Sequence, residues 1–234
     1  MANTPRLSLH GITACVFDAY GTLFDVSSVA RDARDVLGDD WQTLSELWRS
    51  KQLQYTWLRG LGGRHADFWQ VTGDALDFAL ASLSIGDPAL RARLMNRYLE
   101  IAAYPEVPGM LQRLQAQGVR CAILSNGAPA MLAAAVGNAG LAGAFEAVLS
   151  VEKVGVFKPH PAVYQLAVDR LGLAAADICF LSANGWDACS AKAFGFRVLW
   201  CNRFGQAPER IPAPPDGEIT DLSLLPGILA AGRA

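Results

Sequence analysis

Five short, mostly apolar runs, each ending in or followed by a polar residue, constrain the fold of this chain most strongly. They lie at 12–18, 119–125, 147–150, 178–182 and 197–201. Strands that are apolar throughout, without alternating polar residues, are typical of a parallel sheet covered on both faces. Helical patterns at 108–117, 128–139, 161–171 and 187–194 alternate with these runs, and a last short strand is expected near 218–220. The alternation predicts a Rossmann-like, doubly wound α/β fold.

The segment 26–104 interrupts this alternation. It holds helical patterns at about 27–37, 41–59, 66–84 and 87–102 and no convincing strand. Because the first apolar run needs the later runs as sheet neighbours, this helical segment is an insertion and not an independent domain. We therefore predict an α/β core domain formed by 1–25 and 105–234, with a helical cap subdomain at 26–104.

Composition excludes several classes of protein. The net charge of −2 lacks the basic excess typical of a nucleic-acid binder, and a 52% hydrophobic content with 18% charged residues excludes a disordered chain. Five cysteines without a CxxC spacing favour neither a disulfide framework nor a zinc site. Residues 1–11 lack the apolar core of a signal peptide, and no run approaches a membrane span of about 20 residues. We predict a cytoplasmic protein that binds neither nucleic acids nor membranes.

Polar side chains follow the predicted strands at the points where a parallel sheet brings its carboxyl ends together. In open α/β sheets, ligands bind in the crevice outside these ends. Two carboxylates, a lysine, and several hydroxyl and amide groups should therefore meet at one edge: Asp18, Thr22, Ser125, Asn126, Lys158, Ser182, Asn184 and Asp187. Such a set is typical of an enzyme active site.

Four motifs around these residues resemble those of the haloacid dehalogenase superfamily. They are FDAYGTLFD at 17–25, LSNG at 124–127, FKPHPAVY at 157–164 and SANGWDA at 182–188. The cap segment LWRSKQLQYTWLR at 47–59 is similar to that of one branch, the L-2-haloacid dehalogenases. The resemblance implies hydrolysis of (S)-2-haloalkanoic acids to (R)-2-hydroxyalkanoic acids and halide, with inversion at C2. It also implies a homodimer.

The same resemblance assigns roles around the proposed nucleophile, Asp18. Displacement of halide by this carboxylate would form an aspartyl ester that water then hydrolyses. Thr22 would hydrogen-bond the carboxylate, and Lys158 would keep it ionised. Asp187 is a candidate base for the water, with a structural partnership to Lys158 as the alternative. Tyr164 would hydrogen-bond the site or, alternatively, only pack its helix.

The remaining roles concern the substrate. Ser125 and Asn126 would bind its carboxylate, and Arg49 on a cap helix would receive the departing halide together with Asn184. Ser182 and Asn184, with the acidic residue of the same motif, would orient the lysine and the water. Four apolar side chains would surround the alkyl group, one of which, Phe68, would also contact the halide: Tyr20, Leu53, Phe68 and Trp186.

Other functions remain open from the sequence. Most of the superfamily are magnesium-dependent phosphatases with an Asp-x-Asp motif, but Tyr20 stands at the second position here and the last motif has one acid, Asp187. Because a hard divalent cation prefers several carboxylate oxygens, we expect no metal and no other cofactor. A degenerate phosphatase, a non-catalytic binding protein and an enzyme acting mainly on fluoroacetate are the alternatives.

Overall fold

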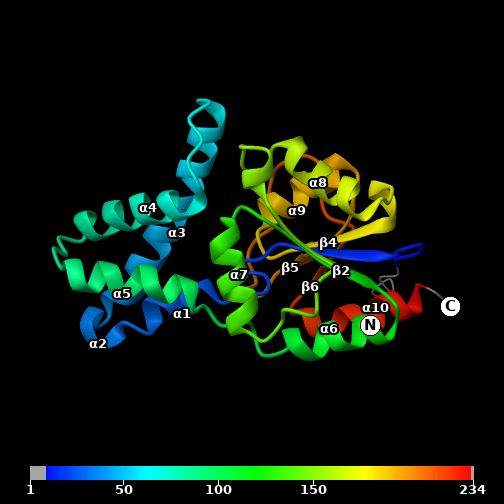
Figure 1. Ribbon diagram of the computed structural model, residues 1–234, viewed down its shortest axis with the longest axis horizontal. Coiled ribbons are helices and arrows are strands. Elements are labelled where there is room, and N and C mark those ends of the chain that lie inside the picture. The colour runs from blue at the N-terminus through cyan, green and yellow to red at the C-terminus, as the bar shows by residue number, and fades with distance from the viewer. Residues whose placement is uncertain (1–8, 233–234) are drawn as a thin grey trace.

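A six-stranded parallel sheet forms the centre of the core (Figure 1). Its strands are β1 (Ala14–Phe17), β2 (Arg120–Ser125), β3 (Ala147–Ser150), β4 (Ile178–Ser182), β5 (Arg197–Cys201) and β6 (Gly217–Ile219), in the order β3-β2-β1-β4-β5-β6. The computed structural model describes residues 9–232, so the parts of the sequence predictions that concern residues 1–8 and 233–234 lie outside the described residues. The predicted Rossmann-like α/β fold is confirmed.

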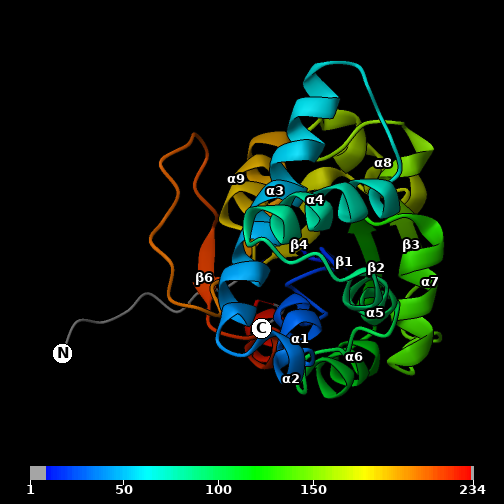
Figure 2. The ribbon, with the colours of Figure 1, turned by 90° about the vertical axis from the view of Figure 1, so that its left-hand side faces the viewer.

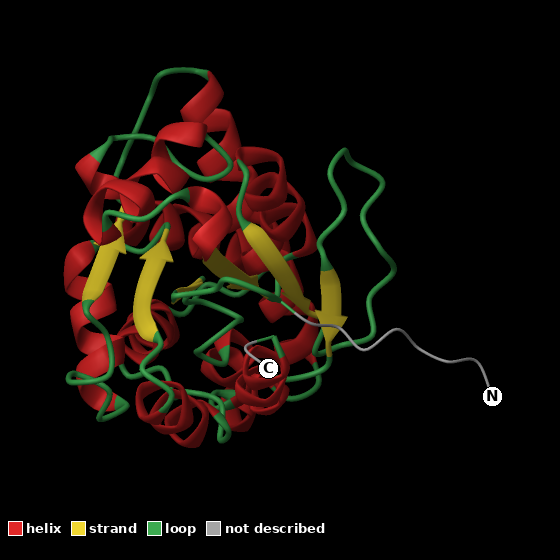
Figure 3. Ribbon diagram, turned by 90° about the vertical axis from the view of Figure 1, so that its right-hand side faces the viewer, coloured by secondary structure: helices red, strands yellow, loops and turns green. Residues whose placement is uncertain are grey.

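Helices cover both faces of the sheet, as the wholly apolar strands require. Figure 1 shows α8 (Pro161–Leu171) and α9 (Gly185–Phe194) on one face, with α6 (Val107–Ala116) and α10 (Leu225–Ala231) on the other. Figure 3 shows helices on both sides of the strands. The helix α7 (Pro129–Asn138) connects β2 to β3, and short 3-10 turns lie at Val151–Lys153, Ala175–Asp177 and Leu222–Leu224. Every residue of β1 and β4 is buried. None of the helices within residues 9–232 is long and apolar enough to span a membrane.

The cap lies to one side of the sheet and consists of helices only. They are α1 (Val26–Arg31), α2 (Arg34–Leu37), α3 (Asp40–Leu61), α4 (Phe68–Ser82) and α5 (Pro88–Leu99). Figure 2, which looks from the cap toward the core, shows α3, α4 and α5 in front of the strands. The helix expected at 27–37 is divided into two. The break lies at residues 32–33, where the Asp32 carbonyl accepts a hydrogen bond from Arg93 Nη2 of α5 at 2.7 Å.

The two segments that connect the cap to the core lie side by side. Asp25 N donates to Ala102 O at 3.0 Å, and Tyr104 N donates to Leu23 O at 2.9 Å. One connection begins immediately after the loop that follows β1. The cap is therefore attached at the carboxyl end of the central strand, where the strand order changes direction and ligands bind in this class of fold.

Candidate active site

Asp18 lies directly after β1 and is only 6% exposed. Its Oδ1 accepts a hydrogen bond from Lys158 Nζ at 3.0 Å, whereas Oδ2 accepts from Thr22 Oγ1 at 3.1 Å and Asn184 Nδ2 at 3.0 Å. Thr22 Oγ1 also accepts from Ala183 N at 2.8 Å, so its single proton is directed at the carboxylate. The two oxygens therefore differ: Oδ2 has two donors, and Oδ1 has one donor and the more available lone pair.

Lys158 is buried between two carboxylates. Its Nζ lies 3.0 Å from Asp18 Oδ1 and 2.9 Å from Asp187 Oδ2. Burial alone would lower the pKa of the ammonium, but the nearby Asp18 and Asp187 carboxylates outweigh it and raise this pKa. The lysine is therefore a permanent positive charge beside the nucleophile at neutral pH.

Asp187, in the first turn of α9, has both oxygens occupied. Oδ2 accepts from Lys158 Nζ, and Oδ1 accepts from the Tyr164 hydroxyl at 2.7 Å. Burial raises the pKa of this carboxyl, while Lys158 opposes the shift. Burial likewise raises the pKa of the Tyr164 hydroxyl, which stays a donor. This geometry favours the alternative weighed for Asp187, a structural partner of the lysine.

Arg49 reaches the site from helix α3 of the cap. Its Nη2 donates to Asn184 Oδ1 at 3.3 Å and to the Tyr20 carbonyl at 3.4 Å, and its Nη1 donates to Gln52 Oε1 at 2.7 Å. All three acceptors are amide or peptide oxygens. Because none of them carries a negative charge, the guanidinium keeps its capacity to attract an anion.

A small chamber lies between Arg49 and Asp18, which both line it. It leaves about 10 Å³ of room. Ten residues line it, and all ten are site residues predicted from the sequence: Asp18, Tyr20, Arg49, Leu53, Phe68, Ser125, Asn126, Lys158, Asn184 and Trp186. The structure thus brings together Asp18, which is the predicted nucleophile, the cap arginine, the strand-end donors and the apolar wall.

Ser125 and Asn126 are arranged to act as donors toward this chamber. Ser125 Oγ accepts from Gly127 N at 3.0 Å, and Asn126 Oδ1 accepts from the Lys158 backbone N–H at 2.9 Å. With these acceptor positions used, the serine proton and the asparagine Nδ2 are the groups left for a ligand. Two N–H or O–H donors at the end of β2 suit a carboxylate.

The other predicted residues, Thr22, Tyr164, Ser182 and Asp187, lie behind the chamber wall. Ser182 Oγ accepts from Asn184 N at 3.2 Å and so holds the loop after β4. We expected Ser182 and Asn184 to orient Lys158. Instead, the Asn184 side chain joins Asp18 to Arg49.

Sequence analysis missed Gln52. This side chain is 1% exposed and contacts Arg49 directly. A signal was present, because Gln52 shares the four-residue spacing of Leu44, Trp48 and Thr56, which together form the buried face of α3. A glutamine within such a stripe indicates a buried hydrogen-bond network.

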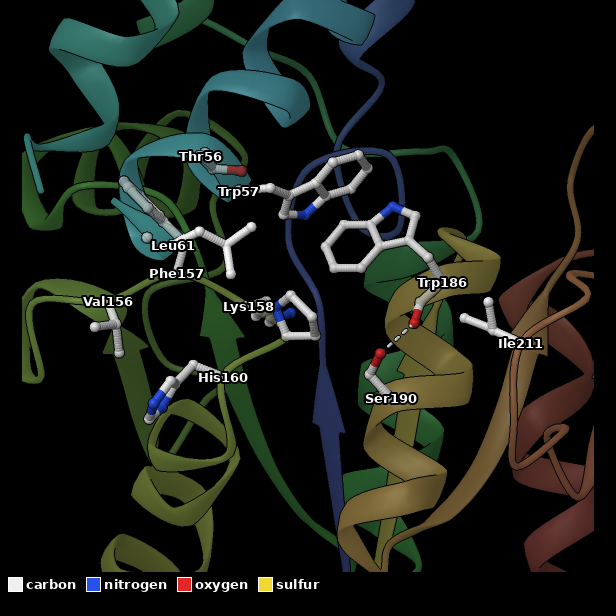
Figure 4. Close-up of a pocket in the computed structure, with 12 residues that line it drawn as sticks. Thr56, Trp57, Leu61, Val156, Phe157, Lys158, His160, Trp186, Ser190 and Ile211 are labelled. Atoms are coloured by element: carbon white, nitrogen blue, oxygen red, sulfur yellow. Dashed lines mark hydrogen bonds between the residues drawn. The ribbon is translucent and has the colours of Figure 1, made fainter. Parts of the chain in front are cut away.

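A second cavity, of about 410 Å³, lies beside the chamber and is mostly apolar. Figure 4 shows Trp57 of α3 next to Trp186 of α9, with Lys158 below them and Ile211 to one side. The two indole rings meet edge to face with centroids 5.3 Å apart. Lys158 and Trp186 belong to the walls of both spaces, so the larger cavity adjoins the chamber.

Comparisons with known proteins identify the family of the chain. The family model described as haloacid dehalogenase-like hydrolase matches residues 12–195. (S)-2-haloacid dehalogenase 1 of Pseudomonas sp. (strain CBS-3) is 46% identical, covering 93% of this chain and 96% of the relative. (S)-2-haloacid dehalogenase 4A of Burkholderia cepacia is 43% identical, covering 94% and 95%.

A solved structure extends the similarity to the whole fold. L-2-haloacid dehalogenase from Xanthobacter autotrophicus with chloropropionic acid covalently bound has a TM-score of 0.88 and 39% identity, covering 95% of this chain and all of that chain. The resemblance that the motifs indicated is thereby confirmed. The chain belongs to the haloacid dehalogenase-like hydrolase family.

Proposed function

We propose that this protein is a hydrolytic (S)-2-haloacid dehalogenase, which converts (S)-2-haloalkanoic acids to (R)-2-hydroxyalkanoic acids and halide. The observation that carries the proposal is the pairing of two groups across one small chamber. On one side, Asp18 Oδ1 is held by Lys158, and on the other, the hydrogen bonds that Arg49 donates within residues 9–232 go to neutral acceptors. A nucleophile facing an anion acceptor is the arrangement that displacement of halide from carbon requires.

In the first step, Ser125 and Asn126 hold the substrate carboxylate and place C2 in front of Asp18 Oδ1. The oxygen forms a bond to C2 as the carbon–halogen bond breaks, and the bonding electron pair leaves with the halide toward Arg49. Asn184 and the edge of Phe68 complete the halide cradle. No proton is transferred in this step, so a second carboxylic acid at the position of Tyr20 is unnecessary.

In the second step, water attacks Cγ of the Asp18 ester. The negative charge that develops on Oδ2 is stabilised by the two donors already on that atom, Thr22 Oγ1 and Asn184 Nδ2. The bond between Cγ and Oδ1, the ester oxygen, then breaks, so Oδ1 leaves as the hydroxyl oxygen of the product and the water oxygen replaces it in the carboxylate. One proton of the water passes to the departing hydroxyl group, and the other is released to solvent. C2 is attacked only once, so its configuration inverts.

Lys158, Asp187 and Tyr164 act together in both steps. The lysine keeps Asp18 ionised, while Asp187 and Tyr164 fix the lysine from behind. We assign Asp187 this positioning role. The alternative role, as base for the water, requires an oxygen that faces the chamber, and both oxygens of Asp187 point to other partners.

A phosphatase site does not fit these residues. Tyr20 occupies the place of the second phosphatase aspartate and packs against Phe68 and Tyr98. Within residues 9–232, no group of three or more His, Cys, Asp or Glu side chains could hold a metal ion. The ammonium of Lys158 lies between the two acids of the site, so the donor set does not suit a divalent cation.

Three further assignments belong to the proposal. We assign residues 26–104 to the cap and the flanking segments to the core. Because Cys121, Cys179, Cys189 and Cys201 are buried free thiols, we assign the protein to the cytoplasm. A homodimer is the third assignment, and sedimentation velocity tests it.

The function is tested by halide release from each enantiomer of 2-chloropropionate in excess EDTA. We expect release from the (S) enantiomer only, and none from Asp18→Asn. Asp87→Asn is the matched control, because Asp87 is an exposed N-cap residue of α5 and asparagine also caps helices well. Activity that requires added metal, or full activity in Asp18→Asn, would contradict the proposal. Fluoroacetate and a phosphate ester, assayed in parallel, test the two alternative reactions.

A further inference from the structure

The cap contains a buried hydrogen-bond network that ends on Arg49. Gln52, three residues later on α3, accepts from Arg49 Nη1 through Oε1 at 2.7 Å. Its Nε2 donates to Thr72 Oγ1 of α4 at 2.7 Å and to the Tyr98 hydroxyl of α5 at 3.1 Å. Gln52, Thr72 and Tyr98 are each at most 2% exposed. The Gln52 side-chain amide is therefore hydrogen-bonded to residues of three cap helices, α3, α4 and α5.

The surroundings fix which end of this amide faces the arginine. Thr72 Oγ1 donates its only proton to the Phe68 carbonyl at 2.6 Å, so it can only accept from Gln52. Trp48 Nε1 anchors the same turn by donating to Thr72 O at 2.9 Å. The NH₂ group of Gln52 must point at Thr72, and its oxygen must point at Arg49.

Neutral partners distinguish Arg49 from Arg203 and Arg59, two other arginines that are not fully exposed. Arg203 pairs with Glu106 at 2.6 Å, and Arg59 pairs with Asp74 at 2.6 Å, so a carboxylate compensates each of these charges. A glutamate would fit the volume of Gln52 and would form the same kind of ion pair with Arg49. The glutamine fixes the guanidinium without neutralising it.

We propose that Gln52 is a positioning residue that holds Arg49 over the chamber and leaves its positive charge available to the departing halide. The inference rests on the proposed function, because it takes Arg49 as the halide acceptor. It explains why a glutamine lies on the buried face of α3, where an apolar residue would pack without hydrogen-bonding requirements.

The central test is Gln52→Glu, with Gln54→Glu as the matched control on the exposed face of the same helix. At pH 8, we expect kcat for (S)-2-chloropropionate to fall at least tenfold in Gln52→Glu and less than twofold in the control. The loss should be smaller for the bromo acid, whose leaving group needs less stabilisation. It should also shrink as the pH falls and the introduced carboxyl becomes protonated. Inhibition by bromide should weaken in parallel.

A second variant, Gln52→Met, separates charge from position. Methionine fills the site without accepting a hydrogen bond, so kcat should fall, but no activity should return at low pH. Equal losses in Gln52→Glu and Gln52→Met with the same pH profile would overturn the proposal, because Gln52 would then serve the fold only. Parental kcat and bromide inhibition in Gln52→Glu would also overturn it.

Bromide binding provides a readout that does not depend on turnover. In crystals soaked in sodium bromide, anomalous scattering should place the ion beside Arg49 in the parent and the control, with reduced occupancy in Gln52→Glu. If the parent releases no halide from any haloacid, the proposed function fails, but this occupancy still decides the role of Gln52. Equal bromide occupancy in the parent and Gln52→Glu would refute that role.

Discussion

Replacing Lys158 with methionine tests the electrostatic balance of the buried site. The change removes an ammonium that lies 3.0 Å from Asp18 and 2.9 Å from Asp187 and keeps most of the side-chain volume. Asp18 would retain hydrogen bonds from Thr22 and Asn184, but Asp187 would retain only the one from Tyr164. The loss of stability should therefore come mainly from the buried Asp187 carboxylate, which keeps only one of its two donors.

Removing one partner of a buried ion pair costs about 3–5 kcal/mol. We expect Lys158→Met to lose this much of its free energy of unfolding at pH 7.5. The size of this loss depends on pH in a predictable direction. Without the ammonium, burial and the Asp18 charge raise the pKa of Asp187 further, so the folded state binds a proton more tightly than the unfolded state. The loss should be absent below about pH 4, the pKa of an unfolded aspartate, and should grow as the pH rises.

Urea unfolding followed by circular dichroism between pH 4 and 8 measures this difference. The double variant Lys158→Met/Asp187→Asn should recover at least half of the loss at pH 7.5 without regaining halide release. Lys192→Met is the control, because the more exposed pair with Asp216 at 2.8 Å is expected to contribute about 0–1 kcal/mol. A deficit below about 1 kcal/mol in Lys158→Met, or one that is the same at pH 5 and pH 8, would refute the reasoning.

Three further substitutions probe the walls of the chamber. Tyr164→Phe keeps the ring but removes the donor to Asp187, so urea unfolding should show a loss of about 1.5–3 kcal/mol. A loss within the error of the parent measurement would contradict that hydrogen bond. Gly127→Ala would place a Cβ 2.7 Å from Tyr20 Cε2; we expect steady-state kinetics to give a raised KM for (S)-2-chloropropionate, and an unchanged KM would show that the Tyr20 ring has room to yield. Arg49→Ala should reduce kcat by about 10²–10³-fold while shifting the thermal midpoint little, and comparable losses of activity and stability would argue against its halide role.

The strands of the sheet could be predicted from sequence because each strand is recognised from the residues of one short segment. The run 178–182 is apolar at every position before its last residue, as expected for a strand covered on both faces, and that last residue, Ser182, indicates the ligand-binding edge. The expected strands and the ten lining residues follow from this pattern together with the motifs. The division of the helix at 27–37 was not found in this way; at the break, the Asp32 carbonyl bonds to Arg93, which is 61 residues away.

The positions of Asp187 and Gln52 also needed the three-dimensional arrangement. Sequence spacing brings Asp187 near Lys158 but does not reveal that Tyr164 takes its second oxygen. Similarly, Gln52 can be recognised as buried from its spacing, but the orientation of its amide is set by Thr72 on another helix. The direction of a hydrogen bond between two helices cannot be recognised from a single segment of sequence.

The paired connections between cap and core have a mechanical consequence. Since Asp25 bonds to Ala102 and Tyr104 bonds to Leu23, the two connections form one short antiparallel ladder and not two separate strings. Such a ladder resists twisting and sideways sliding of the cap relative to the core. The ladder therefore helps to fix where α3 stands over the core and, with it, the position of Arg49 opposite Asp18.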